Sequence, residues 1–304
     1  MTATASKTAV HVSGAEAPAS TATGPFPATF VGISTGATGG RLAVHSAANG
    51  RVLKYLTAAE PGGGPGLPSL SADGTVIFQR GTGSCAATID AVPAGGGPER
   101  VLIPMVGRGN QAIMPGLPSS SADGRYLSYL TARCSAPLDE TVHLRNLHTG
   151  RELTGPGWVG PDAVFLDNDQ QVVSVSGSVV AVLRVPSLTT RTYAAPRGCR
   201  YGSLAGTSTE LLATLDCGAR NALSVVAISP RTFAVTRTLI RLGTCLDASI
   251  SAAAHDPSAL LVETEGACLP PTTAPMVRIL KIRGAEASVV LSGSASFMPI
   301  PAIW

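Results

Sequence analysis

A nine-residue segment of this chain occurs twice with almost the same sequence. Residues 66–74 read GLPSLSADG and residues 116–124 read GLPSSSADG, and each copy runs directly into a short apolar stretch. Self-similarity at a period of roughly 40–50 residues is typical of stacked supersecondary units, and Pro, Ser and Asp-Gly residues around short strands favour propeller blades over helical repeats. The repeat therefore predicts an all-β propeller.

The composition agrees with one β-rich domain. Charged residues make up 13% of the 304 residues, whereas an ordinary soluble protein has about 25%. A repeat array is the usual way in which a single all-β domain reaches this length. The net charge of +3 is small and spread along the chain, whereas a nucleic-acid surface needs clustered Lys and Arg. We expect few helices and no nucleic-acid partner.

The strand pattern predicts six blades of four strands each. Short apolar runs bounded by turn residues recur in groups of four, and five such groups end near residues 103, 153, 194, 240 and 291. The N-terminal runs form a sixth group that lacks its first strand. We expect residues 297–304, which are Pro-rich and end in Trp, to supply that strand by pairing with the N-terminal strands. Such a pairing closes the ring and removes open sheet edges.

The segment before the first predicted strand is rich in Ala, Thr and Ser and nearly free of large apolar groups. We expect residues 1–24 to form a flexible tail and residues 25–304 to form one propeller domain, which acts as a monomer. A secretory signal needs a continuous apolar stretch of about 7–15 residues, and none is visible. The most apolar window, residues 172–185, is interrupted by Ser, Gly and Arg and is shorter than the roughly 20 residues that a bilayer demands. No transmembrane segment is predicted in this chain.

The repeat carries a recognisable motif. The pattern Pro-x-x-Ser-x-Asp-Gly is followed by an apolar strand, a Thr-Gly or Gly-Gly turn and a Val-Leu strand. This motif resembles the WD40-like (PD40-type) repeats of the TolB-like six-bladed propeller family, and the resemblance covers about residues 25–304. Members of that family are mostly extracytoplasmic interaction modules, and similar blades occur in the propeller domains of some peptidases. We expect no hydrolase domain after the blades of this chain.

The six cysteines follow the predicted blade register. Four come directly after a second strand and two come before a first strand, and both kinds of loop lie on the same face of a blade. Paired cysteines imply an oxidising compartment, reached through a signal or anchor upstream of Met1, whereas six reduced thiols would imply a cytosolic protein. The expected pairs are Cys199 with Cys217 and Cys245 with Cys268 within single blades, and Cys85 with Cys134 between neighbouring blades.

No catalytic or metal-binding constellation is evident. Residues 32–36 match the Gly-x-Ser-x-Gly pattern but no helix follows them, and zinc sites need closer Cys pairs than this chain has. His143 and His148 lie on opposite faces of a strand and its turn, so we expect solvent or packing roles for both. We predict no cofactor and no metal. Three acidic residues are expected to cap turns in equivalent positions of different blades: Asp73, Asp123 and Asp256.

The face with the cysteine loops carries many arginines and two aromatic residues. Arginine and aromatic side chains often dominate binding surfaces, although arginines can also serve only to keep an apolar chain soluble. Arg80, Arg220 and Arg241 belong to the same arginine group. The predicted binding residues are Arg108, Arg133, Trp158, Arg197, Arg200 and Tyr201.

The functional hypothesis is a non-catalytic extracytoplasmic propeller that binds a protein or an acidic cell-envelope polymer on this face. One alternative is the ectodomain of a membrane-anchored regulator, with residues 1–24 as the linker. Another is a propeller enzyme of the lactonase, lyase or glycan-cleaving type. The enzyme hypothesis has little support, because the inner strands carry mostly Ser, Ala, Val and Pro rather than acid–base pairs.

Overall fold

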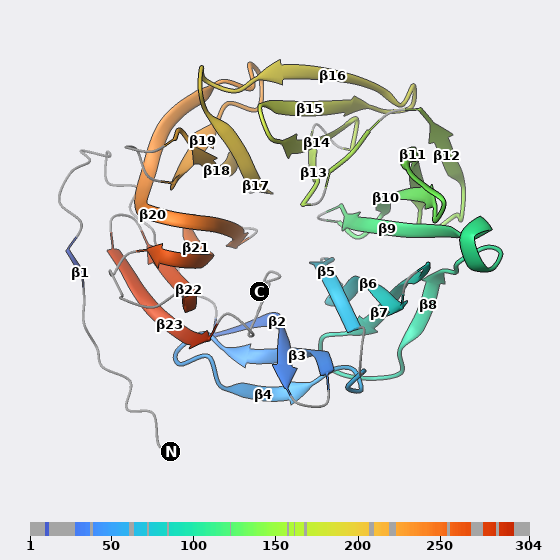
Figure 1. Ribbon diagram of the computed structural model, residues 1–304, viewed down its shortest axis with the longest axis horizontal. Helices are drawn as coiled ribbons and strands as arrows, with labels where there is room; N and C mark the ends of the chain where they lie inside the picture. Colours follow the sequence, from blue (N-terminus) through green and yellow to red (C-terminus); the bar gives the residue numbers. More distant parts are fainter. Residues whose placement is uncertain are drawn as a thin grey trace.

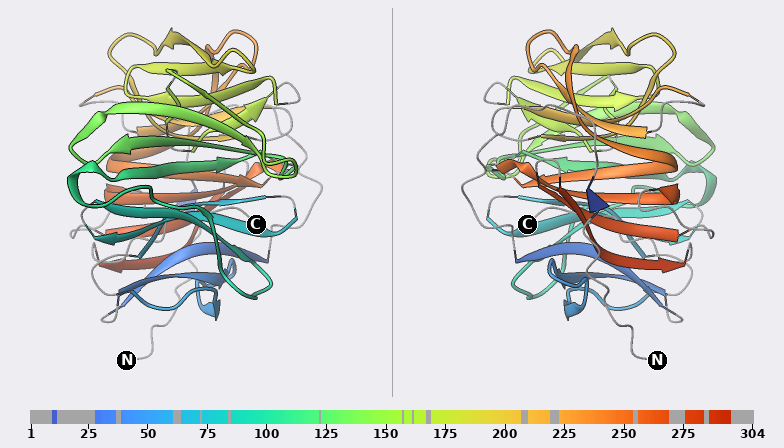
Figure 2. Two further views of the ribbon diagram at one scale, coloured as in Figure 1. Left: turned by 90° about the vertical axis from the view of Figure 1, so that its right-hand side faces the viewer. Right: turned by 90° about the vertical axis from the view of Figure 1, so that its left-hand side faces the viewer.

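The computed structural model is a ring of six β-sheet blades around a central axis (Figure 1). The edge-on views in Figure 2 show a thick disc in which the strands run between two flat faces. Among the described residues there is no α-helix, and the only helical turn is η1 (Gly109–Gln111). The prediction of an all-β six-bladed propeller is therefore confirmed. The structure describes residues 10–11 and 28–294, apart from residues 37–38, 61–63, 72, 84, 122, 157, 161, 167–168, 207–209, 219–222, 254–255, 269–275 and 284–285.

The blades follow one another in chain order, and neighbouring strands within each blade are antiparallel. Blade 1 consists of β2 (Thr29–Gly36), β3 (Gly39–Ser46) and β4 (Val52–Tyr55). Blade 2 consists of β5 (Gly64–Leu70), β6 (Thr75–Gly83), β7 (Ala86–Pro93) and β8 (Arg100–Ile103). Blade 3 consists of β9 (Ile113–Ser120), β10 (Tyr126–Arg133), β11 (Ala136–Asn146) and β12 (Glu152–Gly155). Blade 4 consists of β13 (Val164–Leu166), β14 (Gln171–Ser176), β15 (Val179–Arg184) and β16 (Thr189–Ala194).

Blades 5 and 6 share one long strand. The sequence predicts two strands at residues 234–240 and 248–254, but β20 (Val235–Ala253) is continuous and pairs with β19 over its first half and with β21 over its second half. No Pro or Asp-Gly turn interrupts residues 241–247, so nothing ends the strand there. Gly243, with φ +83°, lies where the strand passes from one blade to the next. The other strands of these blades are β17 (Arg200–Gly206), β18 (Leu211–Asp216), β19 (Leu223–Ile228), β21 (Asp256–Cys268), β22 (Met276–Arg283) and β23 (Glu286–Ser294).

The strands near the two ends of the chain do not follow the four-strand pattern of the other blades. Blade 1 has three strands, and residues 297–304, predicted to supply the fourth, lie outside the described residues. A short strand, β1 (Val10–His11), lies inside the segment predicted as a flexible tail. It pairs with β23, with Val10 opposite Ala287. The unpaired edge of β23 offers backbone hydrogen bonds to these two residues. The flexible tail over residues 1–24 stays a prediction.

Apolar clusters lie between neighbouring blades. Val173 and Val182 of blade 4, for example, pack in one cluster with Leu211 of blade 5. Equivalent clusters fill the other junctions between consecutive blades. Blades 6 and 1 share no strand pairing among the described residues, but Phe30 and Leu261 belong to one buried cluster there. The ring is therefore held together by side-chain packing between separate sheets.

The repeated Ser-x-Asp-Gly motif forms a turn between the first two strands of blades 2 and 3. In blade 3, the Oδ1 atom of Asp123 accepts hydrogen bonds from the Ser121 hydroxyl at 2.6 Å and from the Arg125 backbone N–H at 2.9 Å. Asp73 accepts equivalent bonds from Ser71 and Thr75. The glycine that follows, Gly124 in blade 3, has φ +70°, a conformation that glycine adopts more easily than other residues. Asp256, the third predicted turn residue, is the first residue of β21.

Serine hydroxyls join the innermost strands across the blade junctions. The Ser69 hydroxyl accepts the backbone N–H of Ser120 at 3.1 Å, and the Ser119 hydroxyl accepts that of Ala163 at 3.0 Å. The Ser203 hydroxyl accepts the N–H of Ile250 at 3.2 Å. Ser69 and Ser119 occupy the same position of the repeat, directly after its proline. Among the described residues, the innermost strands of neighbouring blades do not pair with one another, so these backbone N–H groups have no strand partner across the junction. The serine hydroxyls accept their hydrogen bonds instead.

Ser119→Ala tests this linkage between blades. The substitution removes the acceptor of the buried Ala163 N–H, so we expect a loss of about 1–3 kcal/mol in the free energy of unfolding, measured by urea denaturation. The matched control is Ser187→Ala, which changes an exposed serine in the turn between β15 and β16. Equal stability of the two variants would contradict the proposed role of Ser119.

Candidate functional site

The two disulfides lie in the loops where the sequence places them. Cys85, between β6 and β7, is bonded to Cys134, between β10 and β11, and this bond joins blades 2 and 3. Cys199, before β17, is bonded to Cys217, after β18, within blade 5. Both predicted pairs are confirmed.

The third predicted pair, Cys245 with Cys268, lies on β20 and β21. The backbone register puts Cys268 opposite Gly243, two positions before Cys245. The side chains of both cysteines lie outside the described part of the chain. Their pairing therefore stays a prediction.

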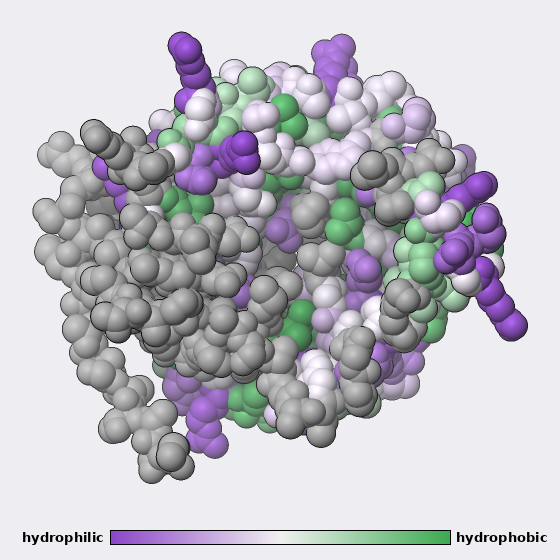
Figure 3. Space-filling view, in the orientation of Figure 1, coloured by the Kyte–Doolittle hydropathy of each residue, from purple (hydrophilic) through white to green (hydrophobic). Residues whose placement is uncertain are grey.

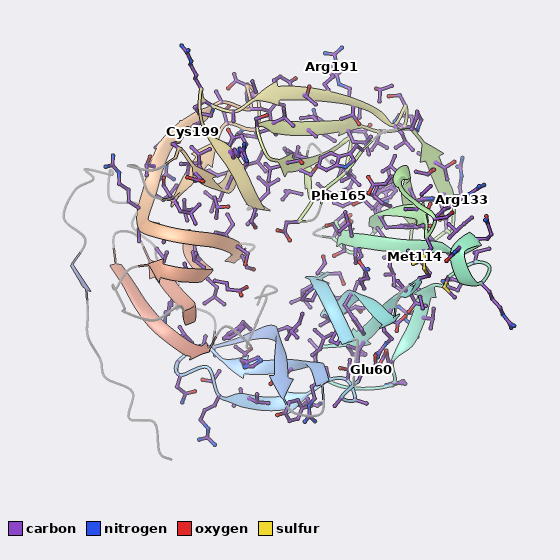
Figure 4. All side chains as sticks on the ribbon, viewed as in Figure 1. Glu60, Met114, Arg133, Phe165, Arg191 and Cys199 are labelled. Carbon is purple, nitrogen blue, oxygen red and sulfur yellow. A yellow bond between two sulfur atoms is a disulfide. The ribbon has the colours of Figure 1, made fainter. Side chains whose placement is uncertain are left out.

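Four of the predicted binding residues are exposed arginines that form two separate groups. Arg197 and Arg200 flank Cys199 in the loop that enters β17, which we call the Cys199 loop (residues 195–200). Arg108 and Arg133 lie at the η1 turn and at the end of β10, near the other disulfide. Figure 4 shows Arg133 and Cys199 on different sides of the ring. The predicted residues therefore do not converge on one site.

The surface pattern agrees with this separation. In Figure 3 the most hydrophilic side chains project from the rim in separate groups rather than over one continuous area. Within the described residues, no carboxylate lies within 4.0 Å of the four arginines. The guanidinium groups of both groups are therefore exposed without an ion pair in the described part of the chain, although Asp216 of β18 lies directly opposite Arg200 in the sheet.

The Cys199 loop is held in a fixed conformation. The backbone N–H of Cys199 donates to the carbonyl of Pro196 at 2.9 Å, and Gly198 has φ +77°. The Cys199 side chain is buried against the core between blades 4 and 5, whereas Arg197 and Arg200 on either side of it point outward as exposed residues. The disulfide thus anchors a tight turn that presents two guanidinium groups.

The two aromatic residues contribute less to the surface than predicted. Tyr201 is only 4% exposed and packs in the cluster between blades 4 and 5, and burial raises the pKa of its hydroxyl. The prediction that Tyr201 is a surface contact is therefore corrected. Successive side chains on a strand point to opposite faces, so Tyr201 points into the core while its neighbour Arg200 is exposed. Trp158 is half-buried, and its ring covers Gly160, where a Cβ atom would lie 2.7 Å from the ring.

The prediction that Arg80 belongs to the group of surface arginines is also corrected. Its side chain is 11% exposed, and its Nε lies 2.7 Å from Asp90 Oδ2. Glu60 and Glu99 pair with the same guanidinium. Three carboxylates from separate segments therefore neutralise Arg80 between blades 1 and 2. Of the remaining arginines, Arg241 is exposed on β20 and Arg220 lies outside the described residues.

One carboxylate that sequence reasoning missed lies among the innermost strands. Asp162 precedes β13, has φ +54°, and accepts a hydrogen bond from the Ser203 hydroxyl at 2.8 Å. No cation of the described chain lies within 4.0 Å of it. Burial raises the pKa of Asp162 to about 6. In the sequence, nothing separates Asp162 from the other aspartates, because its positive φ cannot be read from the residues around it.

The sequence predicts neither a metal site nor a membrane-spanning segment. In the described residues, no group of three or more His, Cys, Asp or Glu side chains has a geometry that could hold a metal ion. No helix in the same part of the chain has the length and apolar character needed to cross a bilayer.

The chain resembles solved propeller structures. TolB from Acinetobacter baumannii superposes with a TM-score of 0.66 at 13% identity, covering 92% of this chain and 68% of that one. An oligogalacturonate lyase in complex with manganese superposes with a TM-score of 0.55 at 14% identity, covering 83% of this chain and 71% of the lyase. A puromycin-hydrolyzing peptidase of Mycobacterium tuberculosis gives 0.55 at 15% identity, covering 86% of this chain but 44% of the peptidase. No protein-family model and no curated protein sequence matches the chain. The chain thus has the TolB-like six-bladed fold, and at these identities the likeness is one of fold alone.

The disulfides should contribute unequally to stability. Loop-closure entropy grows with the number of residues enclosed, so Cys85→Ser/Cys134→Ser, which opens a separation of 49 residues, should cost about 2–4 kcal/mol. Cys199→Ser/Cys217→Ser, with a separation of 18 residues, should cost about 1 kcal/mol less. Urea denaturation of the two double variants measures both values. The reverse order of stabilities would show that native contacts, rather than chain entropy, dominate.

Asp162→Asn should change the pH dependence of stability. The folded-state pKa of Asp162 lies above its ordinary value, so the folded chain binds the extra proton between about pH 4 and pH 6 and its stability falls as pH rises through that window. Asparagine keeps an acceptor for Ser203 but cannot ionise. We therefore expect the variant to gain stability over the wild type between pH 4 and pH 6 in urea titrations. Parallel stability curves would contradict the raised pKa.

Proposed function

We propose that this propeller is an extracytoplasmic platform that binds an anionic partner through the Cys199 loop. The observation that carries the proposal is the pair of exposed guanidinium groups of Arg197 and Arg200 on a disulfide-anchored turn. The partner class is a protein segment or a cell-envelope polymer that carries carboxylate or phosphate groups.

Rigidity and guanidinium chemistry support this function. Ordering a flexible loop on binding costs about 0.5–1.5 kcal/mol for each immobilised side chain, and a turn already fixed by Cys199 avoids part of that cost. A guanidinium group can donate two parallel hydrogen bonds to one carboxylate or phosphate. Two such groups on one turn are therefore suited to repeated anionic groups along an extended partner.

The extracytoplasmic assignment rests on the cysteines. Two disulfides link loops of the described chain, and disulfides of this kind persist in oxidising compartments and are rare in the cytosol. The resemblance of the repeats to the TolB-like family, whose members are mostly extracytoplasmic interaction modules, supports the same location. The arrangement of six blades packed face to face in a ring leaves few sheet faces open to a second copy, which supports a monomer.

Charge reversal at the Cys199 loop tests the proposal. We expect Arg197→Glu/Arg200→Glu to weaken binding to immobilised poly-glutamate and polygalacturonate at least tenfold in biolayer interferometry, and wild-type binding to fall as salt is raised. The matched control is Arg184→Glu/Arg191→Glu, which reverses two exposed arginines on β15 and β16 of blade 4. Figure 4 labels Arg191 on the outer side of this blade. An equal loss of affinity in both double variants would mean that only the net charge of the protein matters. That result would contradict a binding site at the Cys199 loop.

A further inference from the structure

Three side chains on adjacent strands of blade 3 form a hydrogen-bonded chain. Thr131 lies on β10, His143 on β11 and Glu152 on β12. The Oγ1 atom of Thr131 lies 2.8 Å from Nε2 of His143, and Nδ1 of His143 lies 2.9 Å from Oε1 of Glu152. A hydroxyl, an imidazole and a carboxylate connected in this order are the nucleophile, base and orienting acid of many hydrolases.

Tyr129 fixes the orientation of this chain from its buried side. Its ring stacks on His143 with the centroids 4.6 Å apart and the planes 11° apart, and its hydroxyl donates to Glu152 Oε2 at 2.7 Å. Burial alone would raise the pKa of Glu152, but the hydrogen bonds from Tyr129 and His143 outweigh it and hold that pKa below its ordinary value. An ionised Glu152 accepts from Nδ1–H of His143. The opposite nitrogen, Nε2, is then the acceptor for the Thr131 hydroxyl proton.

The three residues can be reached from solvent. The side chain of His143 is 14% exposed and that of Glu152 is 28% exposed, and Thr131 is partly exposed. The sheet register breaks directly beside Thr131, because Thr131 is opposite Thr141 whereas residue 133 is opposite residue 136. Bulges of this kind often occur next to active sites, where they re-aim a side chain or end the pairing.

A cation lies on the same side of the strand as the hydroxyl. The register of β10 with β9 is regular from Thr131 to Arg133, so alternation along β10 places Arg133 on the face of Thr131. Arg133 is exposed, and no carboxylate of the described chain lies within 4.0 Å of it. A guanidinium group in this position favours a substrate that carries a negative charge.

We infer that Thr131, His143 and Glu152 form an acyl-transfer site for small esters whose acyl part is anionic. Nε2 of His143 takes the proton of the Thr131 hydroxyl while Oγ1 bonds to the ester carbonyl carbon. The bond from that carbon to the alcohol oxygen then breaks, and Nε2 returns the proton to the leaving alcohol. Water attacks the acyl-threonine by the same route and releases the acid. This activity goes beyond the proposed binding function and uses a different part of the ring.

The test uses the full chain with p-nitrophenyl hemisuccinate, and with p-nitrophenyl acetate as the neutral comparison. We expect nitrophenolate release above background, reduced to background in Thr131→Ala and reduced about a hundredfold or more in His143→Gln. Peptide mass spectrometry after acid quench should find the succinyl group on Thr131. Arg133→Glu should raise KM for the hemisuccinate and leave that for the acetate unchanged.

Conservative and remote variants separate catalysis from folding. Thr131→Ser keeps a hydroxyl and should retain the activity, whereas Thr141→Ala changes the exposed threonine opposite Thr131 and should leave the rate unchanged. Thermal unfolding of each variant identifies any that fail to fold. Wild-type release no faster than that of folded Thr131→Ala, or a succinyl group on other residues only, would overturn the inference and leave the three residues as a structural hydrogen-bonded chain.

Discussion

Packing between the faces of separate sheets is the interaction on which this structure depends. Each blade is buried on both faces, so both sets of alternating side chains along its strands must be apolar. In blade 4, Val172 packs toward blade 3 and its neighbour Val173 packs toward blade 5. This requirement explains why charged residues make up only 13% of the chain. The nearly buried guanidinium of Arg80 is paired with three carboxylates, one of which belongs to the buried Asp90.

Much of the fold could be predicted from the sequence because the repeat marks its own turns. The Asp-Gly turns that begin blades 2 and 3 lie where the motif places them, and the same register paired Cys199 with Cys217. The prediction failed where that signal is missing. Residues 241–247 contain no turn motif, so the passage of β20 from blade 5 to blade 6 could not be distinguished from two strands and a loop. Val10 and His11 pair with β23 although their local composition is that of a tail.

The side-chain sites were much less predictable, because they depend on contacts between segments that are distant in sequence. Arg80 and Arg197 look alike in the sequence, but only Arg80 meets carboxylates from three separate segments. Tyr201 and Arg200 are neighbours with opposite exposures. His143 was compared in the sequence with His148, the nearest histidine along the chain. Its partners in the structure lie across the sheet, on β10 and β12, and the register that brings them together is set by the whole blade.

The shared strand β20 gives the ring an uneven mechanical construction. A force that separates most pairs of neighbouring blades has to overcome side-chain packing and a connecting loop. Between blades 5 and 6 it must instead tear hydrogen bonds from a strand that belongs to both sheets. Blades 2 and 3 are joined by a covalent bond at the rim. The ring thus contains two reinforced pairs of blades. Across the junction between blades 6 and 1, the described residues contribute a buried side-chain cluster and the two-residue pairing of β1 with β23, from which the chain continues to blade 1.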